Sequence, residues 1–353
     1  MNFDIKNLEN LIQLTNDFLW GWPLIIMFIG VGLAATYMLN FAQFRYFTTS
    51  WKLLLFPDKK YTSGTMTQTQ AFINALNTSI GNGSLAGMAV AVSLGGPGAA
   101  FWIFVLGMFS LIIRYCEVTL SNMFTGTVGQ DGVLGGPMVY LKKVPAGKHL
   151  AYIYAFLCLL LSFFSGNAMQ CNSVRLALER VVTIDKTIVA LVLFLFVIYV
   201  MLGGAKRIIY LSERIVPLKV GLFFLSAIII LSFNFSGIFA ALKLIVTSAF
   251  GYKPVVAGAI GYSMIEALRY GISLPLNATE SGLGTAAILF GSTGSKSPVE
   301  DGIMSMASAF ISNYLVCFVL TLMFVVTGVW NSGITSSALT VSCYETVFGS
   351  LGG

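Results

Sequence analysis

Long apolar stretches separated by short polar ones dominate the chain. About eight of these stretches have close to the 20 residues that an α-helix needs to cross about 30 Å of hydrocarbon. They lie near residues 19–42, 70–93, 98–122, 150–172, 187–204, 215–235, 255–275 and 303–329. The pattern predicts an all-α, polytopic membrane helical bundle in which each stretch is one span.

Composition agrees with this interpretation. The 353 residues are 57% hydrophobic and only 10% charged, which is too apolar for a soluble domain of this size. The 20 Lys and Arg residues outnumber the 14 Asp and Glu residues, but they are scattered over short loops, so no nucleic acid partner is expected. The five cysteines show no paired spacing, and neither a disulfide framework nor a metal site is indicated.

Basic residues are most frequent in alternate loops. They are Arg45, Lys52, Lys59 and Lys60 after the first stretch, Lys142, Lys143 and Lys148 before the fourth, and Lys206, Arg207 and Arg214 between the fifth and the sixth. Because loops rich in Lys and Arg stay on the cytoplasmic side, these loops are predicted to be cytoplasmic and the N-terminus to lie outside. The first stretch lacks the basic lead and the cleavage site of a signal peptide, so we expect it to be retained as a helix.

Glycines and polar side chains interrupt the second stretch. Gly81, Asn82, Gly83 and Ser84 lie in its middle, with Gly87 shortly after them. Glycine weakens a helix, and backbone groups freed inside a membrane must line a cavity or be buried in protein. We therefore predict a helix break that opens a binding site, with close packing of helices as the alternative interpretation of each glycine.

A second interrupted segment lies between residues 255 and 291. Its ends are apolar, its middle at residues 277–284 is polar, and Gly271 and Pro275 precede that middle. The segment is too long for one straight span and too short for two spans with a loop, which favours a discontinuous helix. Two such segments separated by four unbroken ones are typical of two inverted halves, and they predict a substrate site near the membrane midplane.

The first break suits an amino acid zwitterion. Free N–H groups at the start of a half helix bind a carboxylate, while hydroxyl, amide and carbonyl oxygens suit an ammonium group or a sodium ion. The break from Gly81 to Gly87 can supply such N–H groups, while Thr78, Asn77 or an exposed carbonyl can accept from the ammonium group. Gln170 shares a helix face with Asn167 and Ser173, and it is predicted as a further substrate ligand, with interhelical hydrogen bonding as the alternative.

Charged residues inside the apolar stretches form two potential pairs. Arg114 and Glu117, like Glu266 and Arg269, are three positions apart and can neutralise one another, which makes charges in a membrane tolerable. We expect both pairs to be structural, with a proton relay or gate as the alternative. Glu280 has no partner nearby in the sequence, and it is expected either at an inner gate or at a solvated helix terminus.

No enzyme motif is present. The sequence contains no His-Glu-x-x-His, no Gly-x-Ser-x-Gly and no phosphate loop, each of which carries a known chemistry. The single histidine, His149, lies beside Lys148 in a basic loop and is expected at the surface. We therefore expect no catalytic residue and no enzymatic activity.

Several blocks of the sequence resemble the alanine or glycine:cation symporter family. The runs from Ser79 to Ala89 and from Leu94 to Trp102 are similar to its signature region, and further blocks follow in the family's order. These begin at Gly135, Gly166, Gly203, Glu213, Glu280 and Pro298. The resemblance covers roughly residues 20 to 345.

The resemblance implies a LeuT-type inverted repeat with one extra N-terminal helix. Residues 1–353 would form a single transmembrane domain, with the extra helix at about 19–42, the first repeat at about 70–235 and a partial second repeat at about 251–353. It implies sodium-driven uptake of alanine or glycine across a bacterial inner (plasma) membrane, with Na⁺ as the coupling ion and no other cofactor. Carried over by matching motif, it also implies substrate contacts at Thr78, Gly81, Asn82, Gly83, Ser84 and Gln170 and sodium ligands at Asn77 and Ser84. Expected partners are a small neutral amino acid, Na⁺ and the lipid bilayer, while the oligomeric state stays open.

The chain departs from the family pattern at both breaks and at its end. Residues 81–84 read Gly-Asn-Gly-Ser where the family usually has Gly-Thr-Gly-Asn, and Leu274-Pro275 and Ala278-Thr279 replace Arg-Gly and Ser-Asn. The family continues with three more helices, one of which carries paired threonines and a tryptophan implied in binding, whereas this chain stops at Gly353. The alternative function is therefore a truncated or degenerate family member without transport activity, acting at most as an assembly or interaction protein.

Overall fold

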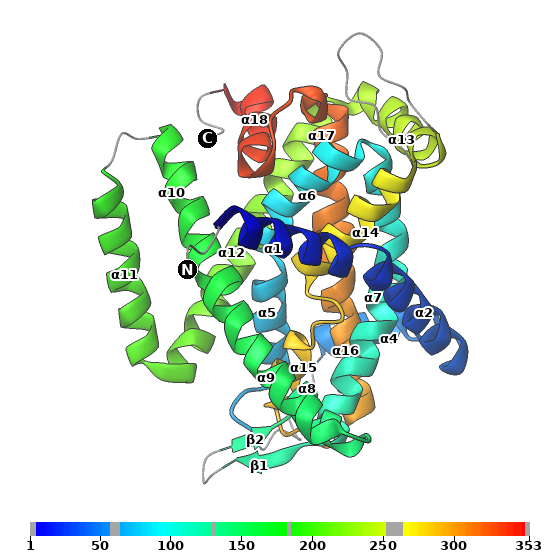
Figure 1. Cartoon of the computed structure of the whole chain (residues 1–353), viewed down its shortest axis with the longest axis vertical. Coiled ribbons are helices and arrows are strands. Elements are labelled where there is room, and N and C mark those ends of the chain that lie inside the picture. Colours follow the sequence, from blue (N-terminus) through cyan, green and yellow to red (C-terminus); the bar gives the residue numbers. More distant parts are fainter. Residues whose placement is uncertain (1–4, 57–63, 129–131, 182–184, 252–263, 350–353) are drawn as a thin grey trace.

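A computed structural model of the chain describes residues 5–56, 64–128, 132–181, 185–251 and 264–349 (Figure 1). Within these residues the chain is helical except for one short hairpin. Strand β1 (Gly126–Val128) pairs with the antiparallel strand β2 (Gly132–Leu134) in the register Thr127 to Val133. The hairpin lies at the lower end of the bundle in Figure 1.

The helical segments follow one another along the described parts of the chain. They are α1 (Ile5–Leu19), α2 (Trp22–Met38), α3 (Ala42–Arg45), α4 (Phe47–Leu55), α5 (Gln68–Ser79), α6 (Asn82–Gly95), α7 (Gly98–Met123), α8 (Pro137–Tyr140), η2 (Leu141–Lys143), α9 (Gly147–Phe163), η3 (Phe164–Ala168), α10 (Met169–Val181), α11 (Lys186–Leu202), α12 (Gly204–Phe233), α13 (Phe235–Phe250), α14 (Met264–Thr279), α15 (Thr285–Gly291), α16 (Pro298–Phe310), η4 (Ile311–Phe318), α17 (Val319–Val326), η5 (Val329–Asn331) and α18 (Ser336–Phe348). Of the short η segments, η3 and η4 are π-helices and the others are 3₁₀-helices.

Among the described residues, five helical stretches are long and apolar enough to cross a membrane. They are Glu9–Met38, Gly98–Met123, Gly147–Arg175, Gly204–Phe233 and Pro298–Val326. Three shorter apolar helices accompany them, namely Asn82–Gly95, Lys186–Leu202 and Phe235–Phe250. These helices confirm the predicted helical membrane bundle, and the chain is a multi-pass membrane protein. They do not test the predicted number of spans.

The predicted spans do not all form single helices. The stretch 70–93 is divided between α5 and α6, and the first part of 255–275 lies outside the described residues. Helix α13 lies between the predicted stretches 215–235 and 255–275, where the hydrophobic pattern predicts a connection and the structure has a further helix. The chain leaves helical geometry only at Asn234, where φ is −110°, and then turns directly into α13.

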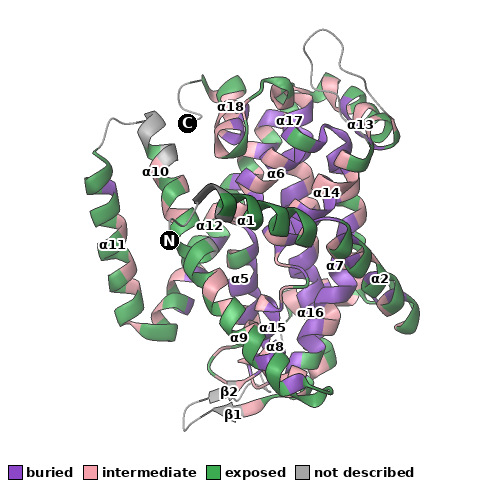
Figure 2. Ribbon diagram, in the orientation of Figure 1, coloured by how far each residue is buried: buried purple, intermediate pink, exposed green. Residues whose placement is uncertain are grey.

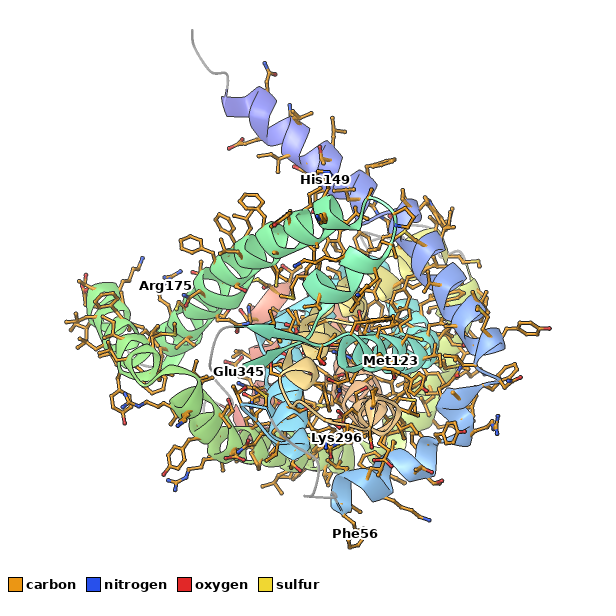
Figure 3. All side chains as sticks on the ribbon, turned by 90° about the horizontal axis from the view of Figure 1, so that it is seen from below. Phe56, Met123, His149, Arg175, Lys296 and Glu345 are labelled. Atoms are coloured by element: carbon orange, nitrogen blue, oxygen red, sulfur yellow. The ribbon has the colours of Figure 1, made fainter. Side chains whose placement is uncertain are left out.

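The centre of the bundle consists of α6, α7, α14 and α16 (Figure 2). Helix α7 packs against α16, α14 and α15, and α14 also packs along α6. By contrast, α9 and α11 expose large apolar side chains such as Phe156, Leu159 and Phe194. Seen from below in Figure 3, α1 projects away from this central group, and Phe56 lies at the outer edge. Apolar side chains on the outer helices suit a surface that faces lipid tails.

Small residues allow α14 to approach its neighbours closely. A Cβ atom on Gly83 would lie 3.6 Å from the Cα atom of Ala278, and one on Gly87 would lie 3.9 Å from the Cβ atom of the same residue. A Cβ atom on Gly271 would lie only 2.6 Å from the carbonyl oxygen of Ala99 in α7. At Gly83 and Gly87 the structure therefore shows close helix packing, which is the alternative interpretation of these glycines.

Candidate functional site

The first helix break lies between α5 and α6, as the sequence predicts. Helix α5 ends at Ser79, and the backbone of Ile80 (φ −111°, ψ 82°) and of Gly81 (φ −145°, ψ −159°) is extended before α6 begins at Asn82. The first N–H groups of a helix have no partner within it. One of them, the N–H of Asn82, donates to the side-chain oxygen of Gln170 at 3.3 Å.

Two of the predicted substrate contacts, Gly83 and Ser84, face the interior of the helix bundle at this break. The hydroxyl of Ser84 is fully buried and donates to the carbonyl oxygen of Ser79 at 2.6 Å. Gly83 packs against Ala278 of α14. Both residues therefore fix the shape of the break from the interior of the bundle.

The second break lies between α14 and α15, within the polar middle of the interrupted segment. Helix α14 ends at Thr279, and α15 begins at Thr285. Three residues between them have positive φ angles: Glu280 at 54°, Gly282 at 87° and Gly284 at 78°. Such angles end a right-handed helix and favour glycine. The predicted discontinuous helix is confirmed.

Two charged residues of α7 hold the second break. The guanidinium Nη2 of Arg114 donates to the carbonyl oxygen of Thr279 at 2.7 Å, and a carboxylate oxygen of Glu117 accepts from the N–H of Gly284 at 3.1 Å. The cation thus meets the negative end of α14 and the anion meets the positive end of α15, which is the favourable arrangement for helix dipoles. Their hydrogen bonds go to the break and not to each other. The two opposite charges nevertheless lie one turn apart on α7, and the mutual neutralisation expected from their spacing stays a prediction.

The expected pair of Glu266 and Arg269 also differs in the structure. Arg269 forms its ion pair with Asp17, at 3.2 Å between Nη2 and Oδ1. Sequence spacing could not indicate this contact, because it depends on α1 lying against α14 from 252 residues away. Glu266 lies in the first turn of α14. Neither residue lines the cavity described next.

A cavity of about 590 Å³ lies between the two breaks, within the range typical of small-molecule sites. In Figure 1, α6 lies above α5 and α14 lies above α15, so both breaks fall at the middle of the bundle. The lining residues are Asn77, Thr78 and Gly81 at the first break, Asn277, Glu280, Leu283 and Thr285 at the second, Leu161, Ser162, Gly166, Asn167 and Gln170 from α9 to α10, and Lys219 from α12. Chain segments more than 200 residues apart in sequence thus face one space.

Some predicted site residues meet in this cavity and others do not. Those that line it are Asn77, Thr78, Gly81, Gln170 and Glu280. Asn82 adjoins it through its hydrogen bond to Gln170. Those that do not line it are Gly83, Ser84, Arg114, Glu117, Glu266 and Arg269. Glu280 lies at a helix end inside the bundle, where one of its carboxylate oxygens accepts from the hydroxyl of Thr285 at 2.5 Å.

A π-helical turn shapes the wall opposite the first break. Segment η3 (Phe164–Ala168) joins α9 to α10, and π-helical turns occur often at functional sites. Gly166 and Asn167 of this turn line the cavity, followed by Gln170 one turn later. The polar run after a long apolar stretch was the sequence signal for this wall.

Lys219 is a charged residue of the cavity that the sequence analysis does not include among the site residues. Its ammonium group donates to the side-chain oxygen of Asn77 at 2.7 Å and to the carbonyl oxygens of Ile80 at 2.6 Å and Asn77 at 3.1 Å. In the sequence it is a single charge, since the apolar stretch 215–235 contains no residue of opposite charge. The signal was nevertheless present, since a lysine inside a membrane span is a functional candidate by default.

The polar groups that line the cavity are mostly uncharged. Its described lining carries amide, hydroxyl and backbone groups together with one ammonium and one carboxylate. Among the described residues, no three His, Cys, Asp or Glu side chains lie where they could hold a metal ion together. Amide, hydroxyl and carbonyl oxygens are instead the ligands that suit an alkali cation.

Known relatives of the chain are transporters. It is 31% identical over 326 residues to an uncharacterised transporter of Haemophilus influenzae, covering 92% of this chain and 71% of the relative. It is 31% identical over 346 residues to the sodium/alanine symporter AgcS of Methanococcus maripaludis, covering 95% and 75% of the two chains. The amino-acid carrier protein AlsT of Bacillus subtilis is 29% identical over 309 residues, with 88% of this chain and 65% of AlsT covered.

A comparison with protein families matches residues 5–353 to the sodium:alanine symporter family. The match extends from α1 to the end of the chain, so it includes both helix breaks and every residue that lines the cavity. The predicted resemblance and the predicted absence of an enzyme are confirmed, because this family and these relatives are transporters. The chain belongs to the sodium:alanine symporter family.

Proposed function

We propose that the chain carries a small neutral amino acid, alanine or glycine, across the bacterial inner membrane together with Na⁺ by alternating access. The observation that supports this most strongly is that two helix breaks from distant parts of the chain line one cavity. Broken helices around a central cavity are the usual binding arrangement of sodium-coupled transporters with inverted repeats. Family membership points to the same function.

The cavity suits both charges of a zwitterion. A substrate carboxylate would be bound by the N–H groups at the start of α6, near Gly81 and Asn82, and by the amide of Gln170. The substrate ammonium would be bound by the hydroxyl of Thr78 and the carboxylate of Glu280 across the cavity. Gly83 and Ser84 would act indirectly, by fixing the backbone that presents these groups.

Sodium is proposed to bind beside the first break. Asn77 and Ser84, the predicted ligands, offer an amide and a hydroxyl oxygen near the carbonyl groups that end α5. The amide oxygen of Asn77 accepts a hydrogen bond from Lys219, so sodium would bind there by displacing that ammonium group. Sodium there would stabilise an outward-facing site, and the bound substrate would then permit the change to the inward-facing form.

The repeat architecture is proposed on the same grounds. Residues 70–235 and 251–353 would be two inverted repeats that begin with the broken helices, and residues 19–42 would be an extra helix in front of them. The basic loops described above would then face the cytoplasm and leave the N-terminus outside. Together these segments would make one transmembrane domain.

Uptake by the purified chain in proteoliposomes tests this function. Labelled alanine or glycine should accumulate under an inward Na⁺ gradient and should fail to accumulate when choline replaces Na⁺. Accumulation that ignores the Na⁺ gradient would contradict the coupling. No accumulation of either amino acid would favour a degenerate member of the family that does not transport.

A further inference from the structure

Lys219 places a positive charge near the middle of a membrane-spanning helix. It lies roughly halfway along the 30 residues of α12, about 20 Å from either end at 1.5 Å per residue. A charge at that depth is expensive unless partners compensate it. The contacts of its ammonium group therefore indicate what this charge does.

The partners of the ammonium form a compact cluster of oxygens, which we call the Asn77–Ile80 cluster. It consists of the carbonyl and side-chain oxygens of Asn77 and the carbonyl oxygen of Ile80, at 3.1, 2.7 and 2.6 Å from Nζ. Ile80 caps α5, where the backbone leaves the helix. Carbonyl groups at a helix C-terminus carry partial negative charge, so the cluster attracts a cation.

The cluster resembles the binding site of a free cation more than a salt bridge. Within the described part of the chain, all three partners of the ammonium are neutral oxygens, and none is a carboxylate. Glu280 is the negatively charged residue of the same cavity, but its hydrogen bond goes to Thr285 at the second break. Neutral carbonyl and amide oxygens are the ligands that alkali cations take in transporters with broken helices.

We propose that the Lys219 ammonium is a tethered cation that competes with a free monovalent cation for the Asn77–Ile80 cluster. The chain itself supplies the charge that sodium would otherwise bring to this end of α5. Replacing the lysine with a neutral residue vacates the cluster, and the cluster then binds Na⁺ more tightly. The inference rests on the proposed function only in naming Na⁺ as the cation, because binding is measured without transport.

Sodium binding by the purified full-length chain in lipid nanodiscs tests this competition. Na⁺ is titrated at constant ionic strength with choline, for the unchanged chain and for Lys219→Met, Lys219→Gln and Lys219→Arg. The two neutral variants should bind Na⁺ at least ~10-fold more tightly than the unchanged chain, a difference well resolved in an affinity measurement. Lys219→Arg keeps the charge and should show no gain. Lys206→Met, at an exposed position of the same helix, should also show none.

Thermal unfolding is a second measurement, which tests the proposal even when the neutral variants are less stable than the unchanged chain. If Lys219 fills a cation site, NaCl should restore the unfolding temperature of Lys219→Met, and choline chloride should not. Equal or weaker Na⁺ affinity, or a loss of stability that both salts leave unchanged, would show that Lys219 only caps α5 and would overturn the proposal. Alanine uptake measured in parallel separates the two proposals, because tighter Na⁺ binding without uptake contradicts the proposed function alone.

Discussion

The side-chain oxygen of Gln170 accepts a hydrogen bond from the backbone N–H of Asn82 across 88 residues of sequence. This contact joins the first turn of α10 to the first turn of α6. The same amide group lies 3.5 Å from the position that a Cβ atom on Gly81 would take. Gln170 therefore covers the open backbone of the first break and lines the cavity with its neighbour Asn167.

Replacing Gln170 with Ala should weaken alanine binding by about tenfold, because the proposed hydrogen bond from its amide to the substrate carboxylate, which is worth about 1.5 kcal/mol, is lost. The unfolding temperature should change little, since Gln170 is only partly buried. Equilibrium binding of labelled alanine measures the effect. Asn172→Ala is the matched control, because Asn172 is exposed on the same helix and bonds to Arg175 instead of the break. Equal losses in the two variants would mean that Gln170 does not contact the substrate.

Glu280 is the carboxylate available to a substrate ammonium in the described lining of the cavity. Glu280→Gln keeps an oxygen for the hydroxyl of Thr285 but removes the charge. Because hydrogen bonds to charged groups are worth about 1.5–3 kcal/mol, we expect alanine affinity to fall by about 10- to 100-fold.

The control for this prediction is Glu345→Gln, at an exposed position of α18, which should leave alanine binding unchanged. Binding of a carboxylic acid without an amino group, such as propionate, provides a second comparison. Its weaker binding should be insensitive to Glu280→Gln. An equal decrease for alanine and propionate would place the effect of Glu280 on the shape of the break and not on the substrate ammonium.

Both helix breaks could be predicted from the sequence because their causes are local. Glycines and polar residues interrupt an apolar stretch at Gly81–Ser84, and helix-ending glycines follow Pro275. The spacing of the two segments also predicted that they would share a site, and both breaks do line one cavity. Local composition is therefore sufficient to locate unwound backbone in a membrane protein.

The partners of individual side chains could not be predicted, because they come from elsewhere in the chain. Lys219 bonds to residues about 140 positions away, and Arg114 bonds to a carbonyl 165 positions away. Spacing along one helix suggests Glu117 for Arg114 and Glu266 for Arg269, but the hydrogen bonds of the two arginines go to residues of other helices. The sequence also could not predict which way each glycine faces, because this depends on the packing of distant helices. Gly81 faces the cavity, whereas Gly83 faces α14.

The glycines of α14 and α12 provide a matched test of close packing. Gly271→Ala would bring its Cβ to 2.6 Å from the carbonyl oxygen of Ala99 and should destabilise the protein by about 1–3 kcal/mol. Gly221→Ala, in α12, meets no atom within 4 Å and should stabilise the helix by up to about 1 kcal/mol. Thermal unfolding in nanodiscs should therefore shift in opposite directions for the two variants. Shifts of the same sign would contradict the packing of α14 against α7.

The charges of Arg114 and Glu117 should stabilise the second break as a unit, because they lie one turn apart on α7 and hold opposite sides of the break. Arg114→Met and Glu117→Gln should each lower the free energy of unfolding by about 2 kcal/mol or more, since each leaves one buried charge without the other. The double variant should be more stable than the sum of the single effects predicts, by about 1 kcal/mol or more. Unfolding of all three variants in nanodiscs measures this coupling. Arg214→Met, at an exposed position of α12, is the control for the removal of an arginine. Additive effects would mean that the two charges act independently, each on its own end of the break.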